Sequence, residues 1–252
     1  MIYKVMDLLT YDDFLNESNI SKKLTDKEVK ERESLLTKNL QQFIEICKKH
    51  KVRYWLDGGT LLGLYRDRAF IPGDSDNDVG IFAEDITLEF LEEIGDNGKY
   101  PIAKQSFWDV YNLIKQFDKD DYVPIKCMKY VSLNGSGKPV MIKDYIWTDI
   151  YFYYPFKNDY IYYCSKVYYS IPKKLIDGFK TMTRDGFTYS IPGNVEKYLE
   201  HEYGKGWVSP DPNYSSYEDP DRYKFVTKKD EFVKKNGVFL WNFKKKESKL
   251  EK

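Results

Sequence analysis

The segment 55-WLDGGTLLGLYRDRAFIPGDSDNDVGIF-82 decides the fold and the chemistry that we expect from this chain. Its first residues end a short buried strand, 52–56, which runs into the glycine turn 57-DGGT-60. A short helix is expected over 61–65, and the alternating pattern of 76–82 predicts a second strand. Strand, glycine turn, helix and acidic strand therefore follow one another directly.

The glycine turn has the features of a phosphate-binding site. Gly58 and Gly59 let a ligand approach the backbone closely, and the free N–H groups of the following turn attract an anion. Thr60 adds a hydroxyl donor at the same place. We expect Arg66, a little further on, to bind a phosphate with its guanidinium; the alternative is a surface arginine in the run 66-RDR-68.

Three aspartates predict a metal site beside this turn. Asp76 and Asp78 are two apart on the expected strand, so both carboxylates project from one face, where like charges are costly without a cation. Asp149 lies among apolar and aromatic residues on a second expected strand, 147–154, and is the candidate for a third ligand. Carboxylate oxygens suit Mg²⁺ (or Mn²⁺), which binds phosphates at its remaining positions. Asp74 either orients a ligand or water, or is only the turn residue of 72-PGD-74.

The remaining sequence predicts one α/β domain over 1–252, with a core at about 25–210. Residues 25–49 read as an amphipathic helix that starts at a Thr25–Glu28 capping box, and 195–203 as a later helix. A hairpin is expected at 158–159. We expect 211–252 to be a C-terminal extension with a charged tail at 244–252.

Composition excludes several classes of protein. Lys+Arg and Asp+Glu both total 40 in the 252 residues, and this balance argues against a polymeric nucleic acid as partner. Three scattered cysteines and two histidines make a zinc site or a disulfide framework improbable and favour a reducing, cytoplasmic location. We see no signal peptide and no transmembrane segment.

The ordered motifs resemble the LicD and fukutin family of phosphotransferases. The family's GG[ST]LLG turn reads 58-GGTLLG-63 here, its IPWD-x-D-x-D strand reads 71-IPGDSDND-78, and its later VD-[IL] strand reads 148-TDI-150. The segment 191-IPGNVEKYLEHEYG-204, with Trp207, is similar to the family's closing motif. The resemblance spans about residues 40–210.

This resemblance implies a nucleotidyltransferase-like fold, an α+β mixed sheet flanked by helices. It also implies an activity: metal-dependent transfer of a substituted phosphate, phosphocholine or a polyol phosphate such as ribitol 5-phosphate, from a CDP-linked donor to a glycan hydroxyl, with release of CMP. The acceptor would be a capsule, lipid-linked or protein-linked glycan. Two alternatives stay open: a nucleotidyltransferase that moves a nucleoside monophosphate onto a small molecule, and a catalytically inactive nucleotide- or sugar-binding protein.

Two positions depart from the family pattern. Gly73 stands where the family usually has Trp, so one wall of the pocket is expected to be missing or more mobile. Asn77 is more polar than the usual aliphatic residue. Neither change removes an expected metal ligand.

Overall fold

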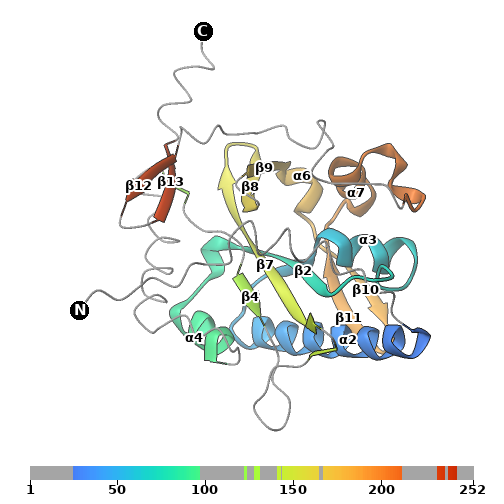
Figure 1. The fold of residues 1–252 in the computed structure, drawn as a ribbon. Helices are drawn as coiled ribbons and strands as arrows, with labels where there is room; N and C mark the ends of the chain where they lie inside the picture. The colour runs from blue at the N-terminus through green and yellow to red at the C-terminus, as the bar shows by residue number, and fades with distance from the viewer. Residues whose placement is uncertain are drawn as a thin grey trace.

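The computed structural model describes residues 25–96, 122–123, 128–130, 141–142, 144–164, 167–211, 232–235 and 238–242. The charged tail expected at 244–252 lies outside these residues. Figure 1 shows a central sheet with the long helix α2 along one side and the shorter helices α3, α6 and α7 on the other.

The described helices and strands follow the chain in a mixed order. The helices are α2 (Asp26–Lys49), α3 (Gly58–Arg66), α4 (Leu88–Asp96), α6 (Lys173–Ile176) and α7 (Val195–Tyr203), with 3-10 turns η1 (Ala83–Asp85) and η2 (Lys205–Val208). The strands are β1 (Tyr54–Leu56), β2 (Asp76–Phe82), β3 (Tyr122–Val123), β4 (Met128–Tyr130), β5 (Met141–Ile142), β6 (Asp144–Tyr145), β7 (Trp147–Phe156), β8 (Asp159–Cys164), β9 (Val167–Pro172), β10 (Lys180–Arg184), β11 (Phe187–Ile191), β12 (Phe232–Lys235) and β13 (Val238–Asn242).

Helix α2 begins at the capping box that the sequence predicts. The Thr25 hydroxyl accepts a hydrogen bond from the Glu28 N–H at 3.3 Å, and the Glu28 carboxylate accepts one from the Thr25 N–H at 2.8 Å. One face of the helix is apolar and buried, including Leu36, Leu40 and Phe43. This face packs against β2 and β7, and burying it stabilises the helix more than its intrinsic propensity does.

The largest sheet of the described residues has six strands. Its path is β1-β2-β7-β8-β9, and β4 also pairs with β7. Strands β2 and β7 are parallel, whereas β1 pairs with β2, and β4 and β8 with β7, in antiparallel fashion. A mixed sheet flanked by helices confirms the α+β fold class.

Close packing of Trp55 on Gly80 fixes how β1 lies against β2. A Cβ atom on Gly80 would come within 2.3 Å of the Trp55 ring, so only glycine fits there. The Trp55 ring also meets Tyr153 of β7 at a centroid distance of 4.6 Å. Three strands of the core are thus locked together directly behind the glycine turn.

The hairpin β10–β11 was not predicted from the sequence. Its five residue pairs run from Lys180↔Ile191 to Arg184↔Phe187, and β11 packs against β1. Asp185 and Gly186 have φ angles of 50° and 77°, as in a two-residue hairpin turn that favours Asp-Gly. The Asp-Gly pair is therefore the local signal in the sequence for this hairpin.

Among the residues that the structure describes, no helix combines the length and the apolar character needed to cross a membrane.

Candidate active site

The two central parallel strands bring the three predicted acids to one place. Asp76 and Asp78 both belong to β2 and, two apart, share one face of the sheet. In the β2–β7 register Asp78 is the direct partner of Asp149, and neighbouring strands lie about 4.8 Å apart. Residues more than seventy positions apart in the chain are therefore side by side at the sheet centre. This placement is what the metal-site prediction required, while the ligand role itself stays a prediction.

The carboxylate of Asp78 is held by groups from two elements. Its Oδ2 accepts a hydrogen bond from the Thr60 N–H of α3 at 3.3 Å, and its Oδ1 accepts one from the Tyr151 hydroxyl of β7 at 3.3 Å. The Asp78 N–H in turn donates to the Thr60 Oγ1 at 2.8 Å. Asp78 is thus fixed between the first turn of α3 and the strand that carries Asp149.

The glycines of the turn allow α3 to start directly against these acids. Gly58 has φ +48°, a left-handed conformation that favours glycine, and a Cβ atom there would lie 2.6 Å from Asp78 Cγ. A Cβ atom on Gly59 would lie 3.1 Å from the Asp74 Oδ2. Any larger residue at Gly58 would push the Asp78 carboxylate out of place. The turn and the acids therefore form one unit.

Burial and mutual repulsion raise the pKa values of two carboxyl groups in this cluster, Asp74 and Asp78. Burial, with the charges of Asp76, Asp149 and Asp57, raises the pKa of Asp78 well above its usual range. Burial, then the charges of Asp76 and Asp78 and a hydrogen bond with Asp76, raises the pKa of Asp74 in the same way. Carboxyl groups packed together in this way are a frequent mark of a functional site.

The donor set fits a hard divalent cation. Asp76, Asp78 and Asp149 offer only carboxylate oxygens, which Mg²⁺ and Mn²⁺ prefer. Within the described segments, no group of three or more His, Cys, Asp or Glu side chains is already arranged as a metal cage. The three acids share a face, Asp78 and Asp149 are register partners, and a cation would also relieve the repulsion that, together with burial, raises the pKa values of Asp74 and Asp78.

Two expected phosphate-binding side chains are engaged elsewhere. Thr60 is buried, and its hydroxyl accepts the Asp78 N–H. Arg66 lies at the other end of α3, about 12 Å along the helix from Gly58. Its guanidinium donates to the Asp67 carboxylate and, at 3.1 Å, to the Trp207 carbonyl oxygen, which ties α3 to η2. The phosphate-binding roles of Gly58, Gly59, Thr60 and Arg66 stay predictions.

The two departures from the family pattern have structural explanations. Gly73 has φ +93°, in the left-handed region that other residues rarely adopt, and a Cβ atom there would have open space around it. Asn77 is fully buried, and its Nδ2 donates to the Leu36 carbonyl oxygen at 3.1 Å and to the Asn39 Oδ1 at 3.2 Å. The polar side chain therefore contacts α2, away from the acids.

Several residues of the site had no role in the sequence-based prediction. Tyr151 and Tyr153 lie two and four residues after Asp149 on β7, so strand alternation alone places them on the same face. Asp57 was noted only as part of the turn, yet it is buried. The side chain of His201 on α7 is only 10% exposed, and its Nδ1 lies 3.3 Å from the Glu202 carboxylate.

Comparison with known proteins is consistent with this geometry. Residues 51–194, more than half of the chain, match the family model described as "LicD/FKTN/FKRP, nucleotidyltransferase domain". The matched range contains the glycine turn, the acidic strand β2 and the part of β7 that carries Asp149. The resemblance expected from the sequence is therefore confirmed.

Three relatives illustrate the range of the family. Ribitol 5-phosphate transferase FKRP of Mus musculus is 26% identical over 185 residues, 71% of this chain and 33% of FKRP. Ribitol-5-phosphate transferase FKTN of Macaca fascicularis is 25% identical over 207 residues, 79% of this chain and 37% of FKTN. Lipopolysaccharide cholinephosphotransferase LicD of Haemophilus influenzae is 41% identical over 58 residues, 23% of this chain and 21% of LicD.

These relatives are named as transferases of phosphate-containing groups, and the chain spans about a third of the length of FKRP and FKTN. The family match covers residues 51–194, which include all three acids. The chain belongs to the LicD/FKTN/FKRP family.

Proposed function

We propose that the chain is a metal-dependent phosphotransferase that moves a substituted phosphate from a CDP-linked donor to a glycan hydroxyl and releases CMP. The transferred group would be phosphocholine or a polyol phosphate such as ribitol 5-phosphate, the groups that the names of the relatives contain. The observation that carries the proposal is the direct register of Asp78 with Asp149 beside the Gly58 turn.

In this reaction the acceptor hydroxyl oxygen attacks the phosphorus of the transferred phosphate. The new O–P bond forms as the bond between that phosphorus and the CMP oxygen breaks, and CMP leaves with the electron pair. The proton of the acceptor hydroxyl passes to the phosphate of the departing CMP or to water. Mg²⁺ or Mn²⁺, held by Asp76, Asp78 and Asp149, would neutralise the charge that develops on the departing phosphate. We assign Asp149 to metal binding rather than to proton acceptance, because a carboxylate beside a divalent cation is a poor base.

The residues of the chain supply positioning. The first turn of α3 presents its backbone N–H end to the acid cluster, where it would also attract the donor diphosphate. Tyr151 fixes one oxygen of Asp78 by its hydrogen bond, which leaves the orientation of that carboxylate defined before a substrate arrives. Asp74, close to Gly59 and Asp76, would orient a ligand or a water molecule.

The test is a screen of CDP-choline, CDP-ribitol and CDP-glycerol with Mg²⁺ or Mn²⁺ and a glycan acceptor, with CMP release as the readout. The Asp76→Asn variant should release no CMP above background, because a ligand is lost. The Asp185→Asn variant is the matched control, since Asp185 is an exposed aspartate on the β10–β11 turn and should behave as wild type. Equal CMP release by Asp76→Asn and wild type would show that the proposed site is wrong.

A second candidate, nucleotidyl transfer, is favoured by the description of the matched family model as a nucleotidyltransferase domain. The mass of the product separates the two. The acceptor gains the substituted phosphate in the first reaction and the whole nucleoside monophosphate in the second.

A further inference from the structure

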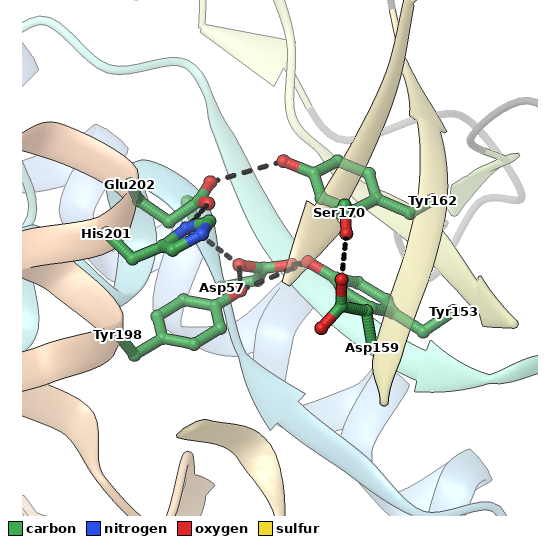
Figure 2. A network of polar contacts seen from close by, with 9 residues as sticks. Asp57, Tyr153, Asp159, Tyr162, Ser170, Tyr198, His201 and Glu202 are labelled. Atoms are coloured by element: carbon green, nitrogen blue, oxygen red, sulfur yellow. Dashed lines mark hydrogen bonds and ion pairs between the residues drawn. The ribbon is translucent and has the colours of Figure 1, made fainter. Parts of the chain in front are cut away.

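The carboxylate of Asp57 is buried between three elements of the fold. Only 3% of the residue is exposed. Its Oδ2 accepts a hydrogen bond from the Tyr153 hydroxyl of β7 at 2.7 Å, and its Oδ1 accepts one from the Tyr198 hydroxyl of α7 at 2.5 Å. The two tyrosine hydroxyls also lie 3.0 Å apart. Figure 2 shows Asp57 between α7 on one side and the strands on the other.

A second buried acid, Glu202, accompanies it on the same helix as Tyr198. Glu202 is 2% exposed and accepts a hydrogen bond from the Tyr162 hydroxyl of β8 at 3.2 Å. Tyr198 and Glu202 are four residues apart, so they share one face of α7, and the rings of Tyr153 and Tyr162 stack at 4.7 Å. Two carboxylate–tyrosine contacts thus join α7 to the sheet (Figure 2).

This network is costly for the fold. Burial, with the charge of Glu202, raises the pKa of Asp57 to about 6, even though three hydrogen bonds stabilise its charged form. Well-packed apolar residues would join α7 to the sheet without this penalty. Stability alone is therefore a poor explanation for two buried acids at this place.

The position of Asp57 indicates what the network does. Asp57 caps α3, with its Oδ1 accepting the Gly58 N–H at 2.8 Å. Its own N–H donates to the Asp78 carbonyl oxygen at 3.0 Å, and the Thr60 N–H, in the first turn of α3, donates to the Asp78 carboxylate. A shift of Asp57 would therefore move both the left-handed Gly58 and the hydrogen-bond donor that holds Asp78.

We propose that Asp57 is a positioning residue: with Tyr198 of α7 and Tyr153 of β7 it fixes the first turn of α3, and through it the Asp78 carboxylate. Helix α7 thereby controls the geometry of the acid cluster without touching it. The catalytic consequence rests on the proposed function, whereas the structural link between Tyr198 and the α3 turn does not.

The experiment compares two tyrosine variants in the full chain. Tyr198→Phe removes the hydroxyl that Asp57 accepts and keeps the buried ring. Tyr154→Phe is the matched control, because Tyr154 is equally buried but its side chain points to the opposite face of β7 from Tyr153. Asp57→Asn is the stronger variant, since Asn retains an oxygen for capping but presents an NH₂ group to one of the tyrosine hydroxyls.

The first readout, amide hydrogen exchange by mass spectrometry, does not require turnover. Tyr198→Phe and Asp57→Asn should raise exchange about 10-fold or more in the peptide covering residues 58–61, with α2 exchanging as in wild type. Tyr154→Phe should leave the 58–61 peptide unchanged. Unchanged exchange at 58–61 in Tyr198→Phe, or an equal rise in α2 and in the turn, overturns the proposal.

The second readout separates positioning from packing. With an active donor, Tyr198→Phe should lower kcat about 10-fold while the donor KM changes by less than about threefold, because the misplaced acid acts on the transition state. A wild-type kcat in Tyr198→Phe overturns the proposal. If the wild-type chain turns over none of the CDP-linked donors, the proposed function fails, and the exchange comparison alone decides the positioning role.

Discussion

The two faces of the β2–β7 pair use the same two strands in opposite ways. On one face, alternate residues present the acids Asp76, Asp78 and Asp149 to the first turn of α3. On the other face, the residues between them, Asn77 and Thr148, are also direct register partners, and both are fully buried against α2. Both faces are polar at the centre of the sheet, but only one of them is charged.

The neutral face directs its side-chain donors to one shared acceptor, while the buried Asn77 Oδ1 has no hydrogen-bond partner among the described residues. The Asn77 Nδ2 and the Thr148 hydroxyl both donate to the Asn39 Oδ1 of α2, at 3.2 and 2.6 Å. On the acidic face, by contrast, carboxylates lie close together, and burial and mutual repulsion raise the pKa values of Asp74 and Asp78. The comparison indicates that the neutral triad holds α2 in register, whereas the acids are kept at a cost that a bound cation would repay.

The largest expected effect comes from Asp78→Asn. The loss of one proposed metal ligand should lower CMP release at least about 100-fold, since even groups that only support a ligand are worth about 10- to 100-fold. The same change removes a repelling charge, so thermal unfolding in EDTA should occur at a higher temperature than in wild type. Full activity, or a lower unfolding temperature, would contradict the view that this face sacrifices stability for function.

The matching change on the neutral face is Asn77→Val. It should lower the free energy of unfolding by about 1–2 kcal/mol, because hydrogen bonds of a buried network are lost, while the folded protein keeps most of its turnover. Urea denaturation and steady-state kinetics measure the two effects. The triple variant Asn39→Leu, Asn77→Val, Thr148→Val should recover much of the lost stability, because no polar side chain of the triad is left buried without its partner. A large loss of kcat in folded Asn77→Val would show that the two faces are not separable.

A smaller effect is expected in the pH dependence of the metal-free chain. The folded-state pKa of Asp57 is raised from 3.8 to about 6, and those of Asp74 and Asp78 are raised in the same direction. The folded state therefore binds more protons than the unfolded state. The contribution of these groups to the free energy of unfolding is fully present below about pH 4 and is lost as the pH rises through about 6. Denaturation in EDTA at pH 5 and pH 7 should show this loss, and Asp57→Asn should reduce it. A stability that rises from pH 5 to 7 in wild type, or an equal slope in the variant, would contradict it.

Local sequence patterns were sufficient to predict much of the fold. The capping box placed the start of α2, and alternation placed β2, β7 and the face that Asp76 and Asp78 share. The pairing of Asp78 with Asp149 followed from a chemical requirement rather than from a local pattern. The parallel register that meets this requirement is a long-range property that no local spacing encodes.

The tertiary contacts of the site were beyond local reasoning. The sequence indicated only that Asp57 belongs to the turn. Its hydrogen-bond partners could not be predicted, because the hydroxyls of Tyr153 and Tyr198 come from elements far along the chain. The contact of Arg66 with the Trp207 carbonyl oxygen could not be predicted either, because nothing in its neighbourhood in the sequence indicates it; the phosphate-binding role of Arg66 stays a prediction. The cytoplasmic location, the CDP-linked donor and the metal ion stay predictions.

The central claim is that Asp76, Asp78 and Asp149 together bind a divalent cation. The most direct test is a crystal of the chain grown with Mn²⁺ and a CDP-linked donor, in which anomalous scattering at the manganese edge locates the metal. We predict a Mn²⁺ ion within about 2.3 Å of carboxylate oxygens from both β2 and β7, and no such peak in crystals of Asp78→Asn. A manganese peak bound elsewhere, with the β2 and β7 acids free of metal, would contradict the account.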